Sequence, residues 1–256
     1  MSCDPAFNPV SDDDEYIFAI QGYLDASADT QWVRVMPIRK SVDLKRDAPA
    51  TVVLEHPESG QSAVMKDSLF EFVYTHAVNY WSTMNIKAGE TYRLTAERSD
   101  GATSSATVTL PEDFPTPVVQ MGRSGFDYVY INGIKKLADV HTRFHTESGK
   151  IVVVPHIRDT VSRRSDDYVV AIDPAEDLAA LGEHNTDGYT RKEIFVAAGG
   201  PNWPPMGSID EDLISMPEGV SNVTSGAGYL AGIVSKILPY RCCFDENGDH
   251  APCPLE

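Results

Sequence analysis

Short segments with β-strand composition recur along the first 110 residues, and turn residues separate them at regular intervals. They are rich in β-branched and aromatic residues, which favour a pleated, half-buried backbone. An Asp-Gly dipeptide between two alternating segments, at Asp100-Gly101, predicts a β-hairpin. The expected strands cover residues 16–24, 31–39, 51–55, 62–65, 91–97 and 105–110. Such strands without intervening helices predict an all-β fold that begins with a β-sandwich of about 100 residues.

A proline-rich stretch at residues 111–117 separates this region from a second one that is also rich in strand signals. The apolar run at 150–156 is nearly continuous, which predicts a strand buried on both faces. Further strands are expected at residues 126–132, 168–172, 193–198 and 228–234. The second region is therefore expected to be β-rich as well.

One short helix is expected in the second region. Asp173 can cap its first turn, and Pro174 suits the first helical position. Glu176 and Asp177 then lie near the positive end of the helix dipole. The helix should stop near Gly182.

Net charge restricts the partners that the chain can have. It carries 38 acidic and 21 basic residues, a formal net charge of −17. This charge repels phosphate backbones and anionic bilayers, so we expect no nucleic-acid partner. Its 42% hydrophobic content is enough for a core, and no apolar run approaches the roughly 18–20 residues of a transmembrane helix.

All four cysteines lie at the ends of the chain, and Cys3 stands alone at the beginning. The polar, proline-punctuated and acidic residues behind it predict a flexible tether at residues 1–14. A cysteine in this position is similar to the lipid-attachment cysteine of a bacterial lipoprotein. Only Met1 and Ser2 precede it, so this interpretation requires that a signal segment was removed. The alternative is an incidental cysteine in a cytosolic protein.

The other three cysteines lie in a tail at residues 241–256. A disulfide from Cys242 or Cys243 to Cys253 would suit an oxidising compartment. A zinc site that adds His250 is an alternative, but adjacent cysteines lack the spacing that lets two thiolates reach one ion comfortably. We favour the disulfide.

A calcium loop is a third hypothesis for the tail. Asp245, Asn247 and Asp249 follow the D-x-N-x-D start of such loops. However, the glycine falls at the fourth position instead of the sixth, and no bidentate glutamate follows at the twelfth. These three residues are therefore weak metal candidates.

His141 and His145 are spaced i, i+4, which places them on one side of a helix or a strand. A metal pair is geometrically possible, with His156 or His184 as a third ligand. No glutamate follows His141 as it would in the H-E-x-x-H motif of metalloproteases. We therefore favour solvated strand histidines, with a metal-dependent hydrolase as the alternative.

A loop dense in glycine and proline, residues 199–207, presents Trp203 and Met206. Exposed side chains of this kind suit sugar stacking or a protein-binding hot spot. In the alternative interpretation Trp203 fills the core of the second region. Trp81 carries the same two interpretations.

No catalytic or cofactor-binding motif stands out. The chain lacks a dinucleotide or phosphate-loop fingerprint and the G-x-S-x-G turn of hydrolases. The abundant paired carboxylates select no glycosidase site, because any chain with this charge has them. We therefore expect neither catalytic residues nor a cofactor.

Several segments resemble known proteins. Residues 88–96, Asp100-Gly101 and residues 106–111 resemble the last hairpin of transthyretin-like or immunoglobulin-like domains in bacterial surface proteins. Together with residues 22–24 and 221–230, they are similar to a family of outer-membrane lipoproteins of unknown function. Members occur in Gram-negative bacteria and are often encoded beside TonB-dependent transporters. The resemblance implies a lipid anchor and a membrane-protein or surface-assembly partner, and it supplies no catalytic residues.

The sequence thus predicts an all-β protein. After the tether at 1–14 come an immunoglobulin- or transthyretin-like β-sandwich at 15–115, a β-rich C-terminal domain with a short helix at 116–240 and the cysteine-containing tail. We expect a non-catalytic lipoprotein of the cell outer membrane, periplasmic or surface-exposed. It would bind a partner protein or a ligand as an accessory to a TonB-dependent transporter. The alternatives are the His141/His145 hydrolase and a structural subunit of a surface assembly.

Overall fold

The computed structural model describes residues 16–38, 50–71, 76–121, 125–156, 160–164, 166–184, 189–203, 221–240, 243–244 and 250–251. Within them the chain is all-β with one short helix, as the sequence predicts. The strands of the first region are β1 (Phe18–Asp25), β2 (Gln31–Pro37), β3 (Thr51–His56), β4 (Gln61–Val64), β5 (Lys66–Glu71), β6 (His76–Ser82), β7 (Thr91–Glu97) and β8 (Thr103–Thr109). The second region has β9 (Val118–Met121), β10 (Asp127–Asn132), β11 (Leu137–Thr146), β12 (Ile151–Pro155), β13 (Thr160–Arg164), β14 (Asp167–Ile172), α1 (Pro174–His184), β15 (Tyr189–Gly199), β16 (Val223–Thr224), β17 (Gly226–Pro239), β18 (Cys243–Phe244) and β19 (His250–Ala251).

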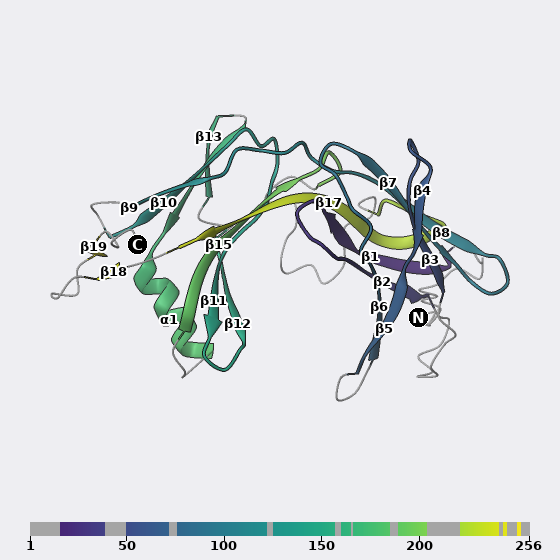
Figure 1. The fold of residues 1–256 in the computed structure, drawn as a ribbon, viewed down its shortest axis with the longest axis horizontal. Coiled ribbons are helices and arrows are strands. Elements are labelled where there is room, and N and C mark those ends of the chain that lie inside the picture. Colours follow the sequence, from purple (N-terminus) through teal and green to yellow (C-terminus); the bar gives the residue numbers. More distant parts are fainter. Residues whose placement is uncertain are drawn as a thin grey trace, which may run out of the picture.

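An eight-stranded sheet runs through both regions, in the order β12-β11-β15-β17-β1-β2-β6-β5. A five-stranded sheet, β16-β8-β7-β3-β4, and a four-stranded sheet, β13-β14-β10-β9, accompany it. Figure 1 shows the two groups of strands on either side of the molecule, with β17 crossing between them. The two regions are therefore joined by a shared sheet as well as by the chain.

The long strand β17 changes its pairing partner along its length. From Gly226 to Ile233 it pairs in parallel with β1, and from Ile233 to Pro239 it pairs antiparallel with β15. Its buried side chains follow the same division, since Leu230 belongs to the core of the first region and Val234 to that of the second. One strand thus supplies backbone partners and core side chains to both regions.

Glycine in β17 permits its close approach to β1. Gly228 has a φ of +104°, and a Cβ there would lie 2.2 Å from the carbonyl oxygen of Ile20. A side chain at this position would both strain the backbone and collide with the neighbouring strand. The parallel pairing therefore requires glycine here.

A buried carboxylate fastens the end of β1 to β17 where the partner changes. Asp25 is 7% exposed, and its Oδ2 accepts a hydrogen bond from the Oγ of Ser235 at 2.6 Å. Its Oδ1 accepts from the backbone N–H groups of Ser27 and Ser235 at 2.9 and 3.2 Å. Gln31 closes the same turn, because its amide bonds both the N–H and the C=O of Asp25. These side chains, the Asp25 cluster, supply hydrogen-bond partners to backbone groups near the end of β1 that do not pair with a neighbouring strand.

Local sequence signals correspond well to the structure. Strands β7 and β8 pair on either side of Asp100-Gly101, and Gly101 has a φ of +87°. The Oδ1 of Asp173 accepts from the N–H of Ala175 at 2.9 Å, which confirms the predicted helix cap. The helix continues past Gly182 to His184. No helix in the described part of the chain has both the length and the hydropathy to cross a bilayer.

The prediction for residues 150–156 is wrong. Strand β12 lies at the edge of the eight-stranded sheet and is not buried on both faces, since Ile151 and Val153 are 55% and 48% exposed. Only the alternate residues Val152 and Val154 pack inward, against a small cluster that includes Leu181 of α1. A continuous apolar run can therefore also be an edge strand with one exposed apolar face.

We expect Asp25→Ala to lower the free energy of unfolding by about 2–3 kcal/mol, because hydrogen bonds to a buried charged group are lost and their donors are left unpaired. Urea unfolding followed by far-UV circular dichroism would measure the change. Asp29→Ala is the matched control, since Asp29 is exposed in the same turn and should change stability by less than about 0.5 kcal/mol. Equal stability of the Asp25 variant and the wild type would contradict this account.

Candidate functional site

One face of the eight-stranded sheet is not covered by the five- and four-stranded sheets, and we name it the open face. The register of the strands shows which side chains share it, because side chains alternate between the two faces. From β12 to β5 these include Ile151, Val153, His145, His141, Arg143, Asp139, Arg191, Glu193, Phe195, Ile237, Ser235, Ile233, Asp25, Tyr23, Gln21, Trp32, Arg34, Asn79, Trp81, Lys66, Ser68 and Phe70.

Three aromatic side chains lie side by side across the open face. Tyr23 of β1 pairs with Trp32 of β2, and Trp32 pairs with Trp81 of β6. The rings of Trp32 and Trp81 are 6.0 Å apart, and the Nζ of Lys66 lies 4.8 Å from the Trp81 ring. Tyr23 and Trp32 are 51% and 44% exposed. We name these three residues the aromatic row; it presents large apolar surface to solvent from three adjacent strands.

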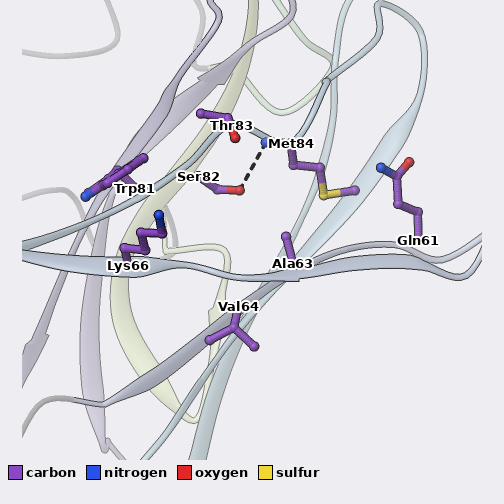
Figure 2. Close-up of a pocket in the computed structure, with 8 residues that line it drawn as sticks. All are labelled: Gln61, Ala63, Val64, Lys66, Trp81, Ser82, Thr83 and Met84. Atoms are coloured by element: carbon purple, nitrogen blue, oxygen red, sulfur yellow. Dashed lines mark hydrogen bonds between the residues drawn. The ribbon is translucent and has the colours of Figure 1, made fainter.

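Hollows follow the aromatic row. The first, of about 270 Å³, lies beside Trp81, and Figure 2 shows Lys66 next to that ring with Ala63 and Met84 nearby. The second, of about 290 Å³, lies around Arg34 and Trp32. The third, of about 370 Å³, lies beyond Trp32 where the first region meets β11, β15 and β17. The open face is thus both aromatic and indented.

The wall of the third hollow contains an oriented arginine. The Nε of Arg143 donates to the Nε2 of His141 at 2.8 Å, and the guanidinium carbon lies 4.1 Å from the centre of the Phe195 ring. Because Nε2 accepts this bond, the His141 proton is on Nδ1, which donates to the Oδ2 of Asp139 at 2.8 Å. The His141 ring also stacks on Phe195, with centroids 4.6 Å apart. Asp139, His141 and Phe195 therefore hold the guanidinium in one orientation.

His141 and His145 both lie on the open face, but each has partners of its own. The Nε2 of His145 is 2.7 Å from the Oε2 of Glu193, whose Oε1 is 3.2 Å from the Nε of Arg191. His141 is only 7% exposed, so the expectation that both histidines are solvated is wrong for it, because Phe195 packs against its ring. Among the described residues, no three histidine, cysteine, aspartate or glutamate side chains are grouped so that they could hold a metal ion.

His156 lies on the opposite side of the sheet, beneath α1. It is 4% exposed; its Nε2 is 2.8 Å from the Oγ1 of Thr142 and 3.3 Å from the Oδ1 of Asp177. The Oδ2 of Asp177 is 3.4 Å from the Nζ of Lys192, and both side chains are buried. Burial opposes ionisation of Asp177, but the hydrogen bond from His156 and the positive charges of His156 and Lys192 outweigh it and lower its pKa. This buried cluster attaches the helix to the sheet.

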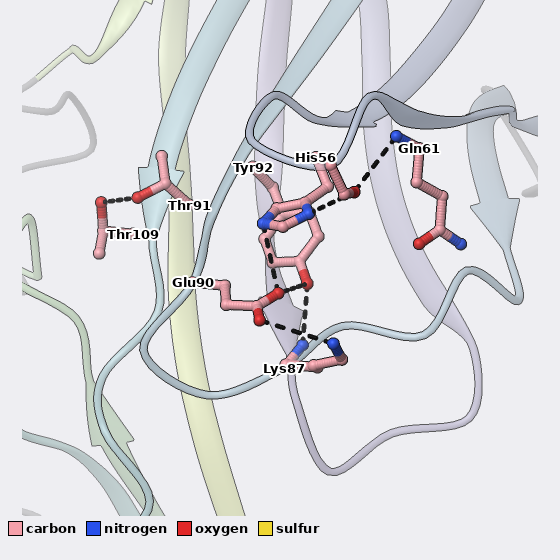
Figure 3. A network of polar contacts seen from close by, with 8 residues as sticks. His56, Gln61, Lys87, Glu90, Thr91, Tyr92 and Thr109 are labelled. Carbon is pink, nitrogen blue, oxygen red and sulfur yellow. Dashed lines mark hydrogen bonds and ion pairs between the residues drawn. The ribbon is translucent and has the colours of Figure 1, made fainter.

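A second polar network lies at the edge of the first core, at residues 56–92. The Nδ1 of His56 is 2.7 Å from the Oγ of Ser59, and its Nε2 is 3.3 Å from the Oε2 of Glu90. The hydroxyl of Tyr92 donates to the same Glu90 oxygen and accepts from the N–H of Lys87, as Figure 3 shows. Burial raises the pKa of Tyr92. The network joins the β3–β4 turn to the segment before β7; the buried Nε2 of His56 contacts Glu90 without a well-formed hydrogen bond.

Trp203 also lies against the open face. It packs on a small cluster formed by Phe195, Ala197 and Ile233, and the Nζ of Lys136 donates to its backbone oxygen at 2.7 Å. This cluster is on the side of the sheet away from the second core, which contains Ile194 and Val196. Trp203 therefore covers part of the sheet next to the third hollow.

The remaining candidates are mostly outside the described residues. Met206, Cys3, Cys242, Cys253, Asp245, Asn247 and Asp249 all lie there. Cys243 is in β18, where its backbone pairs with Ala251, and the side chain of His184 is not described.

Sequence reasoning did not single out Tyr23, Trp32, Arg143 or Phe195. Alternation alone could have placed Tyr23 and Trp32 on the polar side of their strands. Nothing local to Arg143 shows that Phe195 and the end of β1 lie beside it, because those contacts depend on long-range strand pairing. The site is therefore a product of sheet register.

Fold and site together define an all-β protein with an open, aromatic sheet face. The chain belongs to the family described as "Domain of unknown function (DUF4249)", whose model matches residues 5–163. The expected resemblance to a family of unknown function is thus confirmed at that level.

Other comparisons add little. No curated protein matches the chain. Among solved structures it is similar to a pullulanase from Anoxybacillus sp. LM18-11 and to that enzyme complexed with maltotriose, at 12% and 11% sequence identity. Each match covers 71% of this chain and 24% of the pullulanase chain, with a TM-score of 0.25. The chain spans about a quarter of these proteins, and so low a score supports no conclusion about fold or function.

We expect Asp177→Asn to lower the free energy of unfolding at neutral pH by about 3–5 kcal/mol, because it removes the counter-charge of buried cations. The pKa of Asp177 is lowered in the folded state, so its contribution is complete above about pH 4 and is lost as the pH falls further. The difference from the wild type should therefore shrink as the pH falls below about 4. Urea unfolding across that range would measure it.

Glu176→Gln is the matched control for this prediction, because Glu176 is the preceding residue of the same helix and is exposed. It should leave stability within about 0.5 kcal/mol of the wild type. A constant difference between the Asp177 variant and the wild type at all pH values would show that the carboxylate charge is not what stabilises the cluster.

Proposed function

We propose that this protein is a non-catalytic binding protein of the cell envelope that docks a partner protein on its open face. The observation that supports this most is the aromatic row, in which Tyr23 and Trp32 are about half exposed on neighbouring strands. Contiguous exposed apolar surface of this kind marks interaction sites in soluble domains. Tryptophan and tyrosine are also the residues that contribute most to binding energy at protein interfaces.

Charge on the open face supports a protein partner. The strands place four basic and three acidic side chains there: Lys66, Arg34, Arg143 and Arg191, against Asp25, Asp139 and Glu193. The whole chain has a net charge of −17, so the open face is much less acidic than the rest. Like charges repel wrong partners and wrong orientations. A neutral or acidic partner would therefore approach this face in preference to the others.

The cell-envelope location is proposed from the beginning of the chain. Cys3 precedes a polar, acidic segment that suits a tether between a lipid anchor and the fold. With such an anchor the partner would be a membrane protein or a surface assembly, for example a TonB-dependent transporter that the lipoprotein assists. The −17 charge is consistent with a domain held away from an anionic membrane.

We expect Trp32→Ala and Trp81→Ala each to weaken partner binding by about 30-fold or more, the effect of losing a hot-spot residue worth about 2 kcal/mol. The measurement is affinity purification of the tagged, membrane-attached protein from its native host. A partner captured by the wild type is then titrated against each purified variant.

Phe126→Ala is the control, because Phe126 is 40% exposed but precedes β10 in the four-stranded sheet, away from the open face. It should bind the partner as the wild type does. Unfolding curves of all variants would separate lost contacts from lost structure. If the variants are folded and bind equally well, the open face is not the docking surface.

Lipid attachment is tested separately. We expect the native gene product to incorporate labelled palmitate and to sediment with the outer membrane, and Cys3→Ala to lose the label. Replacement of Cys253 by alanine is the control, since that cysteine lies in the tail and should not affect labelling. An unlabelled, cytosolic wild-type protein would contradict the envelope proposal and leave the docking proposal standing.

A further inference from the structure

The third hollow on the open face has the size and lining of a small-ligand site. Its volume of about 370 Å³ lies at the lower end of the range of roughly 300–1,000 Å³ typical of ligand pockets. Tyr23, Trp32, Phe195 and Ile237 provide aromatic and apolar walls, and Arg143 and Asp25 are the charged groups of its lining. Such a mixture of apolar walls and few charged groups is characteristic of sites that orient a ligand.

Arg143 and Asp25 differ in how their charges are satisfied. The carboxylate of Asp25 accepts three hydrogen bonds from Ser27 and Ser235, so the fold already satisfies it. Arg143 is partly buried; its Nε donates to the Nε2 of His141, and its guanidinium group lies over the Phe195 ring. No carboxylate of the described residues forms an ion pair with its guanidinium group, although Glu193 lies opposite Arg143 on β15, where it pairs with His145 and Arg191. A partly buried guanidinium group that forms no direct ion pair would gain from a ligand that brings a carboxylate to it.

The hydrogen bonds around Arg143 orient its guanidinium group for binding a carboxylate. Its Nε is used by His141, and Asp139 fixes the His141 ring from the other side. The two terminal nitrogens keep the fork that binds a carboxylate through two parallel hydrogen bonds. The orientation is set before binding, so little rotational freedom is lost when a ligand arrives.

We propose that the third hollow binds a carboxylate attached to a flat apolar group, with Arg143 on the carboxylate and the Trp32, Tyr23 and Phe195 rings around the apolar part. The inference deepens the proposed function, because it assigns a ligand chemistry to one end of the open face. A free aromatic acid and the C-terminal residue of a peptide share this chemistry. His141 and Asp139 act as positioning residues: His141 bonds Arg143, Asp139 bonds His141, and neither lines the hollow.

The test uses the complete protein and two probes, N-acetyl-phenylalanine and its amide, which differ only in the carboxylate. Trp32 lies in the wall of the hollow, so intrinsic fluorescence and isothermal titration calorimetry can both follow binding. The carboxylate should bind at least tenfold more tightly than the amide. Equal binding of the two probes, or no binding of either, would overturn the inference.

Arg143→Gln should weaken carboxylate binding at least tenfold and leave the amide unaffected. Arg143→Lys should restore only part of the loss, because an ammonium group cannot form the fork. Arg34→Gln is the matched control: Arg34 is on the same face, in the neighbouring hollow, with its Nε bonded to Asn79 at 3.1 Å. It should bind the probes within twofold of the wild type. Unchanged binding by folded Arg143→Gln would overturn the inference.

The positioning role of His141 has its own readout. His141→Ala should reduce the preference for carboxylate over amide, and His141→Gln, whose amide oxygen can accept from the arginine Nε, should restore part of it. A merely structural role would weaken both probes alike and would overturn this assignment.

Comparison of phenylpropionate with Gly-Gly-Phe identifies the source of the carboxylate. Tighter binding of the tripeptide supports a peptide C-terminus, and equal or weaker binding supports a free acid. The proposed function is tested by partner capture with the Trp81 variant, and Trp81 does not line this hollow. The two proposals can therefore fail independently.

Discussion

The exchange of partners along β17 is the constraint on which the rest of the structure depends. Parallel pairing with β1 as far as Ile233 and antiparallel pairing with β15 from Ile233 onward place the two neighbours on successive halves of one strand. This strand joins β12-β11-β15 to β1-β2-β6-β5 in the eight-stranded sheet, and it also carries Leu230 into one core and Val234 into the other. Because β17 is near the C-terminal end of the described chain and β1 near its beginning, this contact closes a very long loop, and its formation is expected to be late in folding.

The open face and its third hollow result from this change of pairing partner along β17, a step in which β1 and β15 occupy successive halves of the strand. Strand β1 ends where β15 begins to pair with β17, so the turn after β1 lies beside Phe195 and Arg143 across β17. The Asp25 cluster satisfies the polar groups that this step exposes. A continuous sheet with both partners along the whole strand would offer a flat surface there, whereas the step produces a recess with walls from both regions.

Local signals predicted much of the fold, and long-range pairing explains the rest. The Asp100-Gly101 turn and the Asp173 cap involve neighbours in the chain, so the sequence was sufficient for them. The residues of the site could not be predicted in this way, because Arg143 lies beside Phe195 and the end of β1 only through the pairing of strands distant in the sequence. The same limit explains the edge strand β12, where an apolar run meets solvent instead of a second sheet. Whether an apolar strand is central or at an edge depends on the order of the strands in the sheet. The hydrophobic periodicity of a sequence carries no information about that order.

The net charge of the chain affects where on its surface the proposed partner or ligand would bind. A protein with a charge of −17 repels anions over most of its surface. An anionic ligand or an acidic partner would therefore approach best where basic side chains locally outweigh acidic ones, as Lys66, Arg34, Arg143 and Arg191 do on the open face. The same field would disfavour approach to the other faces, so the acidity of the chain would favour the open face for the proposed partner. The net charge from which we expect no nucleic-acid partner would therefore also favour the open face over the other faces for an acidic partner.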